Sequence, residues 1–308
     1  MIKYPKNIME FDKEFNTEKS CLEYLIKLRY PDGKYTCSLC GSKKSWRVRE
    51  YTYECAECHH QESVLSGTIF QDTHKPLMLW FRAIWYITSQ KNGTSALGLQ
   101  RVLGIGSYKT AWTWLHKLRR AMVRPGRDRL SGLVEVDETY LGAAETGGKR
   151  GRGAENKALL AIAVETTENV VGRIRISIVE DASRSSLYGF IQDSIEPGTT
   201  VVTDGWLGYS GLDKHGYFHK IIVHQSDGTL LPHVHTVISL MKRWIMGTLQ
   251  GSFSREHLPY YCDEYTFRFN RRKSNSRGML FYRLLQNAVQ LEPVTYKNII
   301  KNGATCVK

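Results

Sequence analysis

Carboxylates inside an otherwise apolar run are the first residues of this chain that point to chemistry. The stretch "LVEVDETYLG", residues 133–142, is typical of a half-buried strand, yet it carries Glu135, Asp137 and Glu138. A further aspartate, Asp204, directly follows the apolar run "TTVV". Desolvated carboxylates that approach one another repel unless they share a cation. Paired carboxylates that bind two divalent ions are a standard device for attack on a phosphodiester, so Asp137 and Asp204 are candidate metal ligands.

Strand alternation limits which of these side chains can act together. Glu135 and Asp137 share one face of the expected strand, and Glu138 lies on the other. Alternation does not decide whether Glu135 or Asp137 is the ligand. A cap or a surface position would explain any one aspartate by itself, whereas the pair in a basic chain favours metal-dependent chemistry.

Four cysteines form a second candidate site. They stand in two Cys-x-x-Cys pairs, "CSLC" and "CAEC", separated by residues 41–54. Two such pairs can close on one tetrahedral zinc, and a site of four thiolates supports folding rather than catalysis. A redox pair or a disulfide is the alternative, but seven cysteines, an odd number, argue against a full disulfide framework. The predicted zinc ligands are Cys37, Cys40, Cys55 and Cys58. The neighbouring His59 and His60 could replace a ligand, but we interpret them as surface residues.

The charge balance indicates a polyanionic partner. The 308 residues include 43 Lys and Arg and 30 Asp and Glu, which gives a net charge of +13. The pI is near 9.4, and this basic balance favours nucleic acid over an acidic small molecule. No apolar run is long enough to span a membrane, and the N-terminal residues lack the apolar core of a signal peptide. We therefore expect a cytoplasmic protein with no membrane partner.

A helical segment follows the cysteines. "KPLMLWFRAIWYITSQ" has apolar residues at helical spacing, and a second helix is predicted in "TSALGLQRVL". The turn "GIGS" then leads into a third helix, "YKTAWTWLHKLRRAM", which completes the outline of a helix-turn-helix. A plain helical hairpin is the alternative. In the DNA-binding interpretation the third helix offers four side chains to a major groove, namely Tyr108, Lys109, Thr113 and Lys117.

The second half of the chain has the pattern of a mixed sheet. "VRPGRDRLSG", residues 123–132, is the expected linker because it holds Pro, Gly and charge without an apolar period. Strands are predicted at 133–140, 157–165, 169–178 and 199–203, with a helix at about 182–193, a possible strand in "HKIIVH" and a long helix around 233–247. This order suggests a mixed sheet covered by helices.

Five blocks of the sequence resemble one family. "CSLCGS", "YECAECHHQESVLSGTIFQDTHKPLMLWFRAIW", "VEVDETYLG", "VVTDGWLGY" and "YYCDEYTFRFNRR" are similar to the ISXO-like bacterial insertion-sequence transposases, and they occur in that family's order. The family joins a zinc ribbon to a catalytic domain with an Asp-Asp-Glu, Asp-Asp-Asn or Asp-Asp-His triad. The resemblance spans about residues 15–290. It implies an α+β multidomain fold, with a zinc ribbon and flanking helix at 15–70, a helix-turn-helix-like DNA-binding segment at 71–124 and a ribonuclease H-like mixed-sheet domain at 132–290.

The resemblance also implies an activity. A transposase of this kind binds the terminal inverted repeats of an insertion sequence and catalyses metal-dependent strand cleavage and strand transfer into target DNA. Asp137 matches the first catalytic aspartate and Asp204 the second, which leaves Glu135 as a neighbour. The expected cofactors are structural zinc and catalytic Mg²⁺ or Mn²⁺. The expected state is a homodimer or higher oligomer on DNA, associated with the bacterial nucleoid. The competing interpretations are a catalytically silent DNA-binding regulator and a simple metal-dependent nuclease.

The third metal ligand differs in kind from the two aspartates. "LPHVHTVISLMKRWIMGT" contains no Asp or Glu, so either two acidic ligands suffice or another donor completes the site. We predict His235, with His233 as the alternative. His235 lies seven residues before Lys242, a spacing that returns a helix to the same face, and the two match the third ligand and the following Lys of family members with a His-type triad. A cap histidine with an exposed lysine is the competing interpretation.

Two further basic segments are candidate DNA contacts. "GGKRGRG", residues 147–153, follows the first catalytic strand and has the composition of a flexible cationic loop. A solvated surface loop is the alternative. "TFRFNRRKSNSR" sets arginines beside phenylalanines, and there Arg268 could instead be an internal ion-pair partner. The predicted phosphate-binding residues of the two segments are Lys149, Arg150, Arg152, Arg271 and Arg272.

Overall fold

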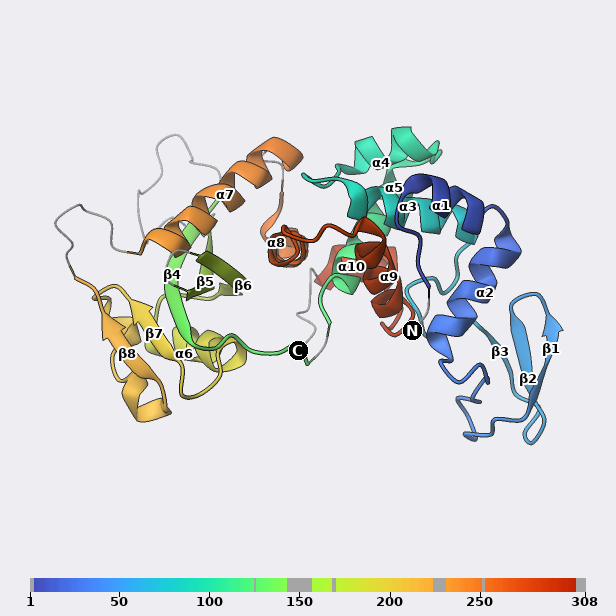
Figure 1. Ribbon diagram of the computed structural model, residues 1–308, viewed down its shortest axis with the longest axis horizontal. Coiled ribbons are helices and arrows are strands. Elements are labelled where there is room, and N and C mark those ends of the chain that lie inside the picture. The colour runs from blue at the N-terminus through green and yellow to red at the C-terminus, as the bar shows by residue number, and fades with distance from the viewer. Residues whose placement is uncertain are drawn as a thin grey trace. The chain divides into compact units, whose positions relative to one another are not determined.

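The computed structural model describes residues 3–124, 126–142, 157–167, 170–223, 231–250 and 253–302 (Figure 1). The described residues form two compact units, one up to Arg124 together with 274–302, the other between Pro125 and Lys273. This division differs from the domain limit predicted at residue 290. Helix α9 (Arg277–Ala288) packs against helices of the first unit, because its apolar face, with Phe281 fully buried, joins the aromatic core there.

The N-terminal part of the first unit is a small antiparallel ribbon preceded by helices. Helices α1 (Ile8–Glu14) and α2 (Glu18–Arg29) lead into strands β1 (Ser45–Arg49), β2 (Thr52–Cys55) and β3 (Gln61–Ser63), which pair in the order β1-β2-β3. Helix α2 begins with a capping box formed by Thr17 and Ser20. Its Cys21 is fully buried and is therefore a core residue. It does not belong to either of the two cysteine pairs.

The rest of the first unit is helical. It contains α3 (Leu77–Ser89), α4 (Ala96–Leu103), α5 (Tyr108–Ala121), α9 and α10 (Tyr296–Asn302). The apolar residues at helical spacing in α3 are all buried, as their period predicts. Trp80 of α3 stacks on Trp114 of α5 with ring centroids 3.7 Å apart. Gly104, with φ of 62°, ends α4 in the left-handed region that favours glycine. The helix-turn-helix outline is present as α4, a short turn and α5.

The second unit is a five-stranded mixed sheet with helices on both faces. Its elements are β4 (Leu133–Leu141), β5 (Ala158–Thr167), β6 (Val170–Val179), α6 (Arg184–Ser194), β7 (Thr200–Thr203), β8 (Phe218–Ile221), α7 (Pro232–Leu249) and α8 (Leu258–Asn270). The strand order is β6-β5-β4-β7-β8. Strands β4, β5 and β6 are antiparallel, whereas β7 runs parallel to both β4 and β8. The predicted mixed sheet and α+β class are confirmed, and this order is that of a ribonuclease H-like sheet.

The sheet of the second unit is covered on both faces. The near-continuous apolar run of β5 is buried along almost its whole length, as expected of a strand covered on both faces. One face packs on α7 and α8, and the other on α6 (Figure 1). The side chains of β4 alternate between these two layers, so its carboxylates are also divided between them. Among the described residues, no helix is long and apolar enough to cross a membrane.

Candidate metal centres and nucleic-acid contacts

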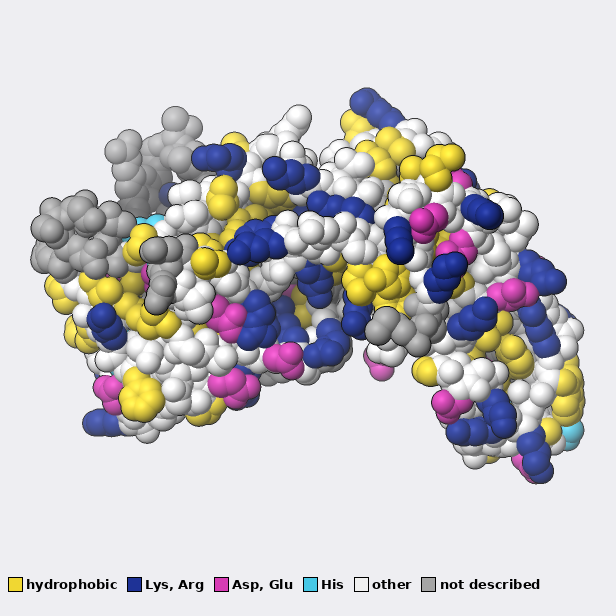
Figure 2. All heavy atoms as spheres, viewed as in Figure 1, with side chains coloured by type: hydrophobic (Ala, Val, Ile, Leu, Met, Phe, Trp, Pro, Cys, Tyr) yellow, Lys and Arg dark blue, Asp and Glu magenta, His cyan; other side chains and the backbone are white. Residues whose placement is uncertain are grey.

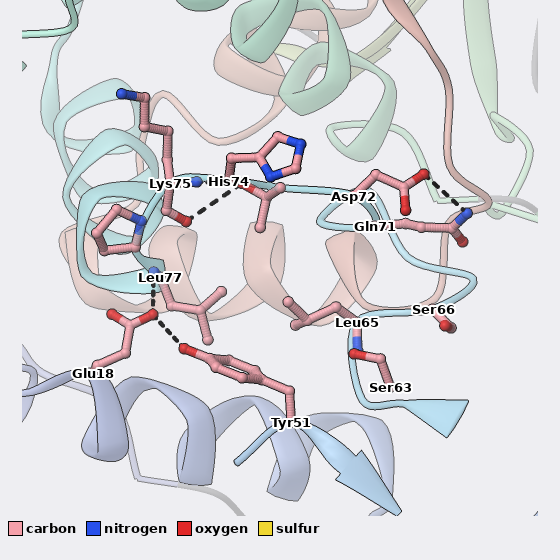
Figure 3. A pocket seen from close by; sticks show the side chains of 12 residues that line it. Glu18, Tyr51, Ser63, Leu65, Ser66, Gln71, Asp72, His74, Lys75 and Leu77 are labelled. Carbon is pink, nitrogen blue, oxygen red and sulfur yellow. Dashed lines mark hydrogen bonds between the residues drawn. The ribbon is translucent and has the colours of Figure 1, made fainter. Parts of the chain in front are cut away.

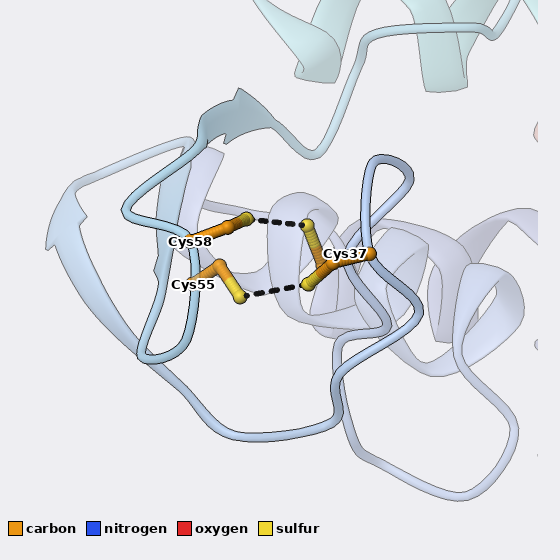
Figure 4. Close-up of side chains that lie close together, drawn as sticks. Cys37, Cys55 and Cys58 are labelled. Carbon is orange, nitrogen blue, oxygen red and sulfur yellow. Dashed lines mark hydrogen bonds between the residues drawn. The ribbon is translucent and has the colours of Figure 1, made fainter.

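The four cysteines of the ribbon converge on one point (Figure 4). Their Sγ atoms all lie within 4.8 Å of one another, with 3.7 Å between Cys37 and Cys58 and 3.5 Å between Cys40 and Cys55. Thiolates at zinc–sulfur distances of about 2.3 Å in a tetrahedron lie roughly 3.8 Å apart, whereas disulfide sulfurs are only about 2.05 Å apart. The arrangement therefore fits a structural zinc in a Cys₄ site.

The Cys-x-x-Cys turns also prepare two of these thiols for metal binding. A hydrogen bond from the backbone N–H of Cys58 lowers the pKa of Cys55 to about 6. The backbone N–H of Cys40 likewise lowers the pKa of Cys37. The donor is the fourth residue of each turn, so the local spacing helps to stabilise the thiolate form of Cys37 and Cys55, and side chains of the other pair contribute.

The carboxylates of β4 follow the predicted alternation. Glu138 points toward the α6 layer, where its carboxylate accepts a hydrogen bond of 2.7 Å from the buried hydroxyl of Tyr209. Glu135 and Asp137 lie on the opposite face, toward α7. The two carboxylates on that face have different partners, since Glu135 contacts His233 and Asp137 contacts His235.

Asp137 and His235 form the centre of the candidate active site. The Asp137 Oδ2 atom lies 3.1 Å from His235 Nε2, and its Oδ1 atom accepts the backbone N–H of Glu138 at 2.8 Å. Burial raises the pKa of Asp137, the charge of Asp204 raises it further, and the Glu138 N–H and His235 act in the opposite direction. The side chain of His235 is 51% exposed, so this pair is open to solvent on the histidine side.

Asp204 lies level with Asp137 at the end of the neighbouring strand, because Glu135 pairs with Val202 in the parallel register. It directly follows β7, which runs parallel to β4, and its Oδ1 atom accepts the backbone N–H of Trp206 at 3.0 Å. Asp137, Asp204 and His235 form a looser group than the four cysteines do. Within the part of the chain that the structure describes, the four cysteines are the only group of three or more ligand residues gathered within 4.8 Å. The donor set of two carboxylates and an imidazole nevertheless suits Mg²⁺ or Mn²⁺.

The two histidines of α7 contact different carboxylates. His233 Nδ1 lies 2.6 Å from Glu135 Oε1, and this contact leaves His235 alone against Asp137. Lys242 is exposed on α7, two helical turns beyond His235. Dark blue side chains lie over the C-terminal part of α7 in Figure 2, where Lys242 and Arg243 are both exposed.

The predicted DNA-reading residues of α5 divide into two kinds. Tyr108 is 53% exposed, and Lys109 is exposed with its Nζ 3.9 Å above the ring of Tyr296. The Thr113 hydroxyl donates to the carbonyl of Lys109 at 2.7 Å. Lys117 is turned inward, in contrast to the prediction. Its ammonium donates to the carbonyl of Ile69 at 3.1 Å, and burial lowers its pKa.

The arginines after α8 are also partly turned to the protein. The guanidinium of Arg272 lies 4.0 Å from the centre of the Phe269 ring and donates to the carbonyls of Phe269 and Gly172. Burial lowers the pKa of Arg272. This residue therefore ties α8 to β6, although it remains exposed, and its role at DNA stays a prediction. Arg271 lies 4.3 Å over the ring of Phe267.

Two remaining predictions have different outcomes. Arg268 donates to the carboxylate of Glu264 at 2.7 Å, and Glu264 is 1% exposed, so the internal ion pair holds. The predicted phosphate-binding loop with Lys149, Arg150 and Arg152 lies outside the described residues.

A pocket of about 500 Å³ lies beside the start of α3 (Figure 3). Glu18 is at its edge and accepts the backbone N–H groups of Leu77 and Met78 at 2.6 and 3.1 Å. The hydroxyl of Tyr51 donates to the same carboxylate at 2.6 Å. Glu18 therefore caps α3, and the anion-binding position at this helix end is already taken by the chain itself.

Comparison with known proteins identifies both parts of the chain. Residues 16–61 match the transposase zinc-ribbon domain, and residues 129–270 match the ISXO2-like transposase domain. The chain is also 28% identical over 255 residues to an uncharacterized protein in transposable element ISH50 of Halobacterium salinarum. That alignment covers 76% of this chain and 85% of the relative.

Proposed function

We propose that this protein, whose two matched domains identify it as a member of the ISXO2-like transposases, binds the ends of an insertion sequence and catalyses their cleavage and transfer into target DNA. The observation that carries the proposal is the contact of Asp137 with His235. Asp137 belongs to β4, which is adjacent to β7, the strand that Asp204 follows. These positions of the two aspartates support a site that His235 would complete.

Asp137, Asp204 and His235 would hold the catalytic metal ions. Bound Mg²⁺ or Mn²⁺ would stabilise the charge that develops on the attacking and leaving oxygens of a phosphodiester. The side chains have separate parts in this arrangement. The two carboxylates supply the negative charge that attracts a divalent cation, and their mutual repulsion falls when a cation is shared. Burial, and to a smaller extent the charge of Asp204, raises the pKa of Asp137. Lys242, exposed on the same helix as His235, would bind a phosphate of the DNA backbone.

DNA recognition is assigned to the first unit. Tyr108 and Lys109 are exposed at the start of α5, where the second helix of a helix-turn-helix meets the major groove. The net charge of +13 supplies the long-range attraction to terminal repeats and target DNA. Arg271 and the loop residues Lys149, Arg150 and Arg152 are proposed as further phosphate contacts, and we propose a homodimer or higher oligomer as the active form on DNA, within the bacterial nucleoid.

A strand-transfer assay tests this function. Purified protein is incubated with labelled DNA that carries the element's own ends, a target plasmid, and Mg²⁺ or Mn²⁺. Joined products support the proposal. Cleavage without joining would indicate a metal-dependent nuclease, and tight binding without cleavage would indicate a catalytically silent regulator.

A further inference from the structure

Helix α7 begins without a cap of its own. Its N-cap residue is Leu231, whose side chain has no hydrogen-bonding group, and no side-chain cap bond forms there. Pro232 follows at the first helical position and has no N–H. The first free donors of the helix are therefore the backbone N–H groups of His233 and Val234, which need an acceptor from elsewhere in the fold.

Glu135 of β4 supplies that acceptor from almost a hundred residues away. Its Oε2 atom accepts the N–H groups of His233 and Val234 at 2.9 and 2.8 Å. Its Oε1 atom lies 2.6 Å from Nδ1 of the His233 ring. The side chain is buried, with 6% of the residue exposed. A buried carboxylate at a helix N-terminus makes charge-assisted hydrogen bonds and interacts favourably with the helix dipole.

The same strand and the same helix make a second contact two residues further on. Glu135 binds His233, and Asp137 contacts His235. Residues two apart on a helix do not normally share a face. Both contacts place the N-terminal turn of α7 against β4, and the carboxylate that binds the backbone of this turn is that of Glu135.

We propose that Glu135 is a positioning residue of the candidate metal site, which sets the imidazole of His235 against Asp137 by anchoring the first turn of α7. The inference rests on the proposed function, because it concerns the geometry of the same metal ligands. It predicts that loss of the Glu135 charge weakens metal binding, although Glu135 itself is not a ligand. A cap that only stabilised the fold would leave metal affinity unchanged in folded protein.

Mn²⁺ titration of the full-length, zinc-loaded protein, followed by the electron paramagnetic resonance of free Mn²⁺, tests this inference. The Asp137→Asn variant defines the part of the binding that belongs to the site. Glu135→Gln keeps the shape of the side chain but removes its charge, and we expect its Kd for Mn²⁺ to rise about tenfold, as for groups that orient metal ligands. His233→Ala removes only the ring contact and should give a smaller rise.

Glu264→Gln is the matched control, because Glu264 is also a buried, paired carboxylate of the second unit. It should lose stability but bind Mn²⁺ as the wild type does. Equal Mn²⁺ affinity in wild type and folded Glu135→Gln would overturn the inference alone, as would equal weakening by Glu264→Gln. If Glu135→Gln fails to fold, an unchanged Mn²⁺ affinity in His233→Ala would overturn the inference. Wild-type binding that does not depend on Asp137 would overturn the proposed function as well.

Discussion

The two candidate metal sites of this protein are built in opposite ways. The ribbon site takes its four ligands from two short turns between Cys37 and Cys58, and all four sulfurs converge. The site of the second unit takes Asp137, Asp204 and His235 from two adjacent strands and a helix. One site depends on local spacing, and the other depends on a completed sheet. In the second site the His235 side chain is 51% exposed, whereas that of Asp137 is 16% exposed.

The largest expected effect separates chemistry from folding. Asp137→Asn and Asp204→Asn should each lower strand cleavage and strand transfer at least about a thousandfold, because several kcal/mol of transition-state stabilisation depends on the metal ions. Zinc content and affinity for end DNA should stay near the wild-type values. Cleavage rate, metal analysis and a binding titration measure the three quantities. Strand transfer at the wild-type rate in either variant would remove that aspartate from the site.

Loss of one zinc-binding thiolate should disturb the ribbon and leave the metal site of the second unit intact. Cys37→Ser should lower zinc from about one ion per chain to well below that, and the ribbon should unfold locally because its folding depends on the metal. The Mn²⁺ site of the second unit should be retained. Cys21→Ala is the control, since Cys21 is buried in α2 away from the cluster, and it should keep its zinc. Full zinc in Cys37→Ser would show that the ligand is misassigned.

The histidines of α7 test the more dispersed site directly. His235→Ala should reduce cleavage about 10- to 100-fold and should reduce Mn²⁺-supported activity more than Mg²⁺-supported activity, because imidazole is a better ligand for Mn²⁺. His233→Ala should be mild, since Glu135 keeps its two backbone donors. Cleavage rates in both metals provide the measurement. The opposite ranking would make His233 the ligand, and two fully active variants would leave only the aspartates.

The difference between the two sites also explains what could be predicted from the sequence. The apolar periods predicted β4 to β7 and α6 closely, and the cysteine spacing predicted the ribbon ligands. The resemblance, rather than any pattern, distinguished Asp137 from Glu135. Nothing local indicated that Glu135 caps α7, because the donors are almost a hundred residues away and become neighbours only when the sheet forms. For the same reason the sequence did not predict the limit of the second unit at Lys273, since α9 continues the helical pattern but packs in the other unit.

The smallest expected effect concerns two lysines that helical spacing alone could not distinguish. Lys109 is exposed, so Lys109→Ala should weaken binding to end DNA and reduce the slope of log K against log salt by about one. Lys117 donates to the carbonyl of Ile69, so Lys117→Met should keep the salt dependence but lower the free energy of unfolding by about 1–3 kcal/mol, the cost of an unsatisfied buried acceptor. Salt-dependent binding titrations and chemical denaturation distinguish the two. A reduced salt dependence of DNA binding in Lys117→Met, with normal stability, would show that Lys117 contacts DNA. An unchanged salt dependence in Lys109→Ala would argue against α5 as a DNA-binding helix.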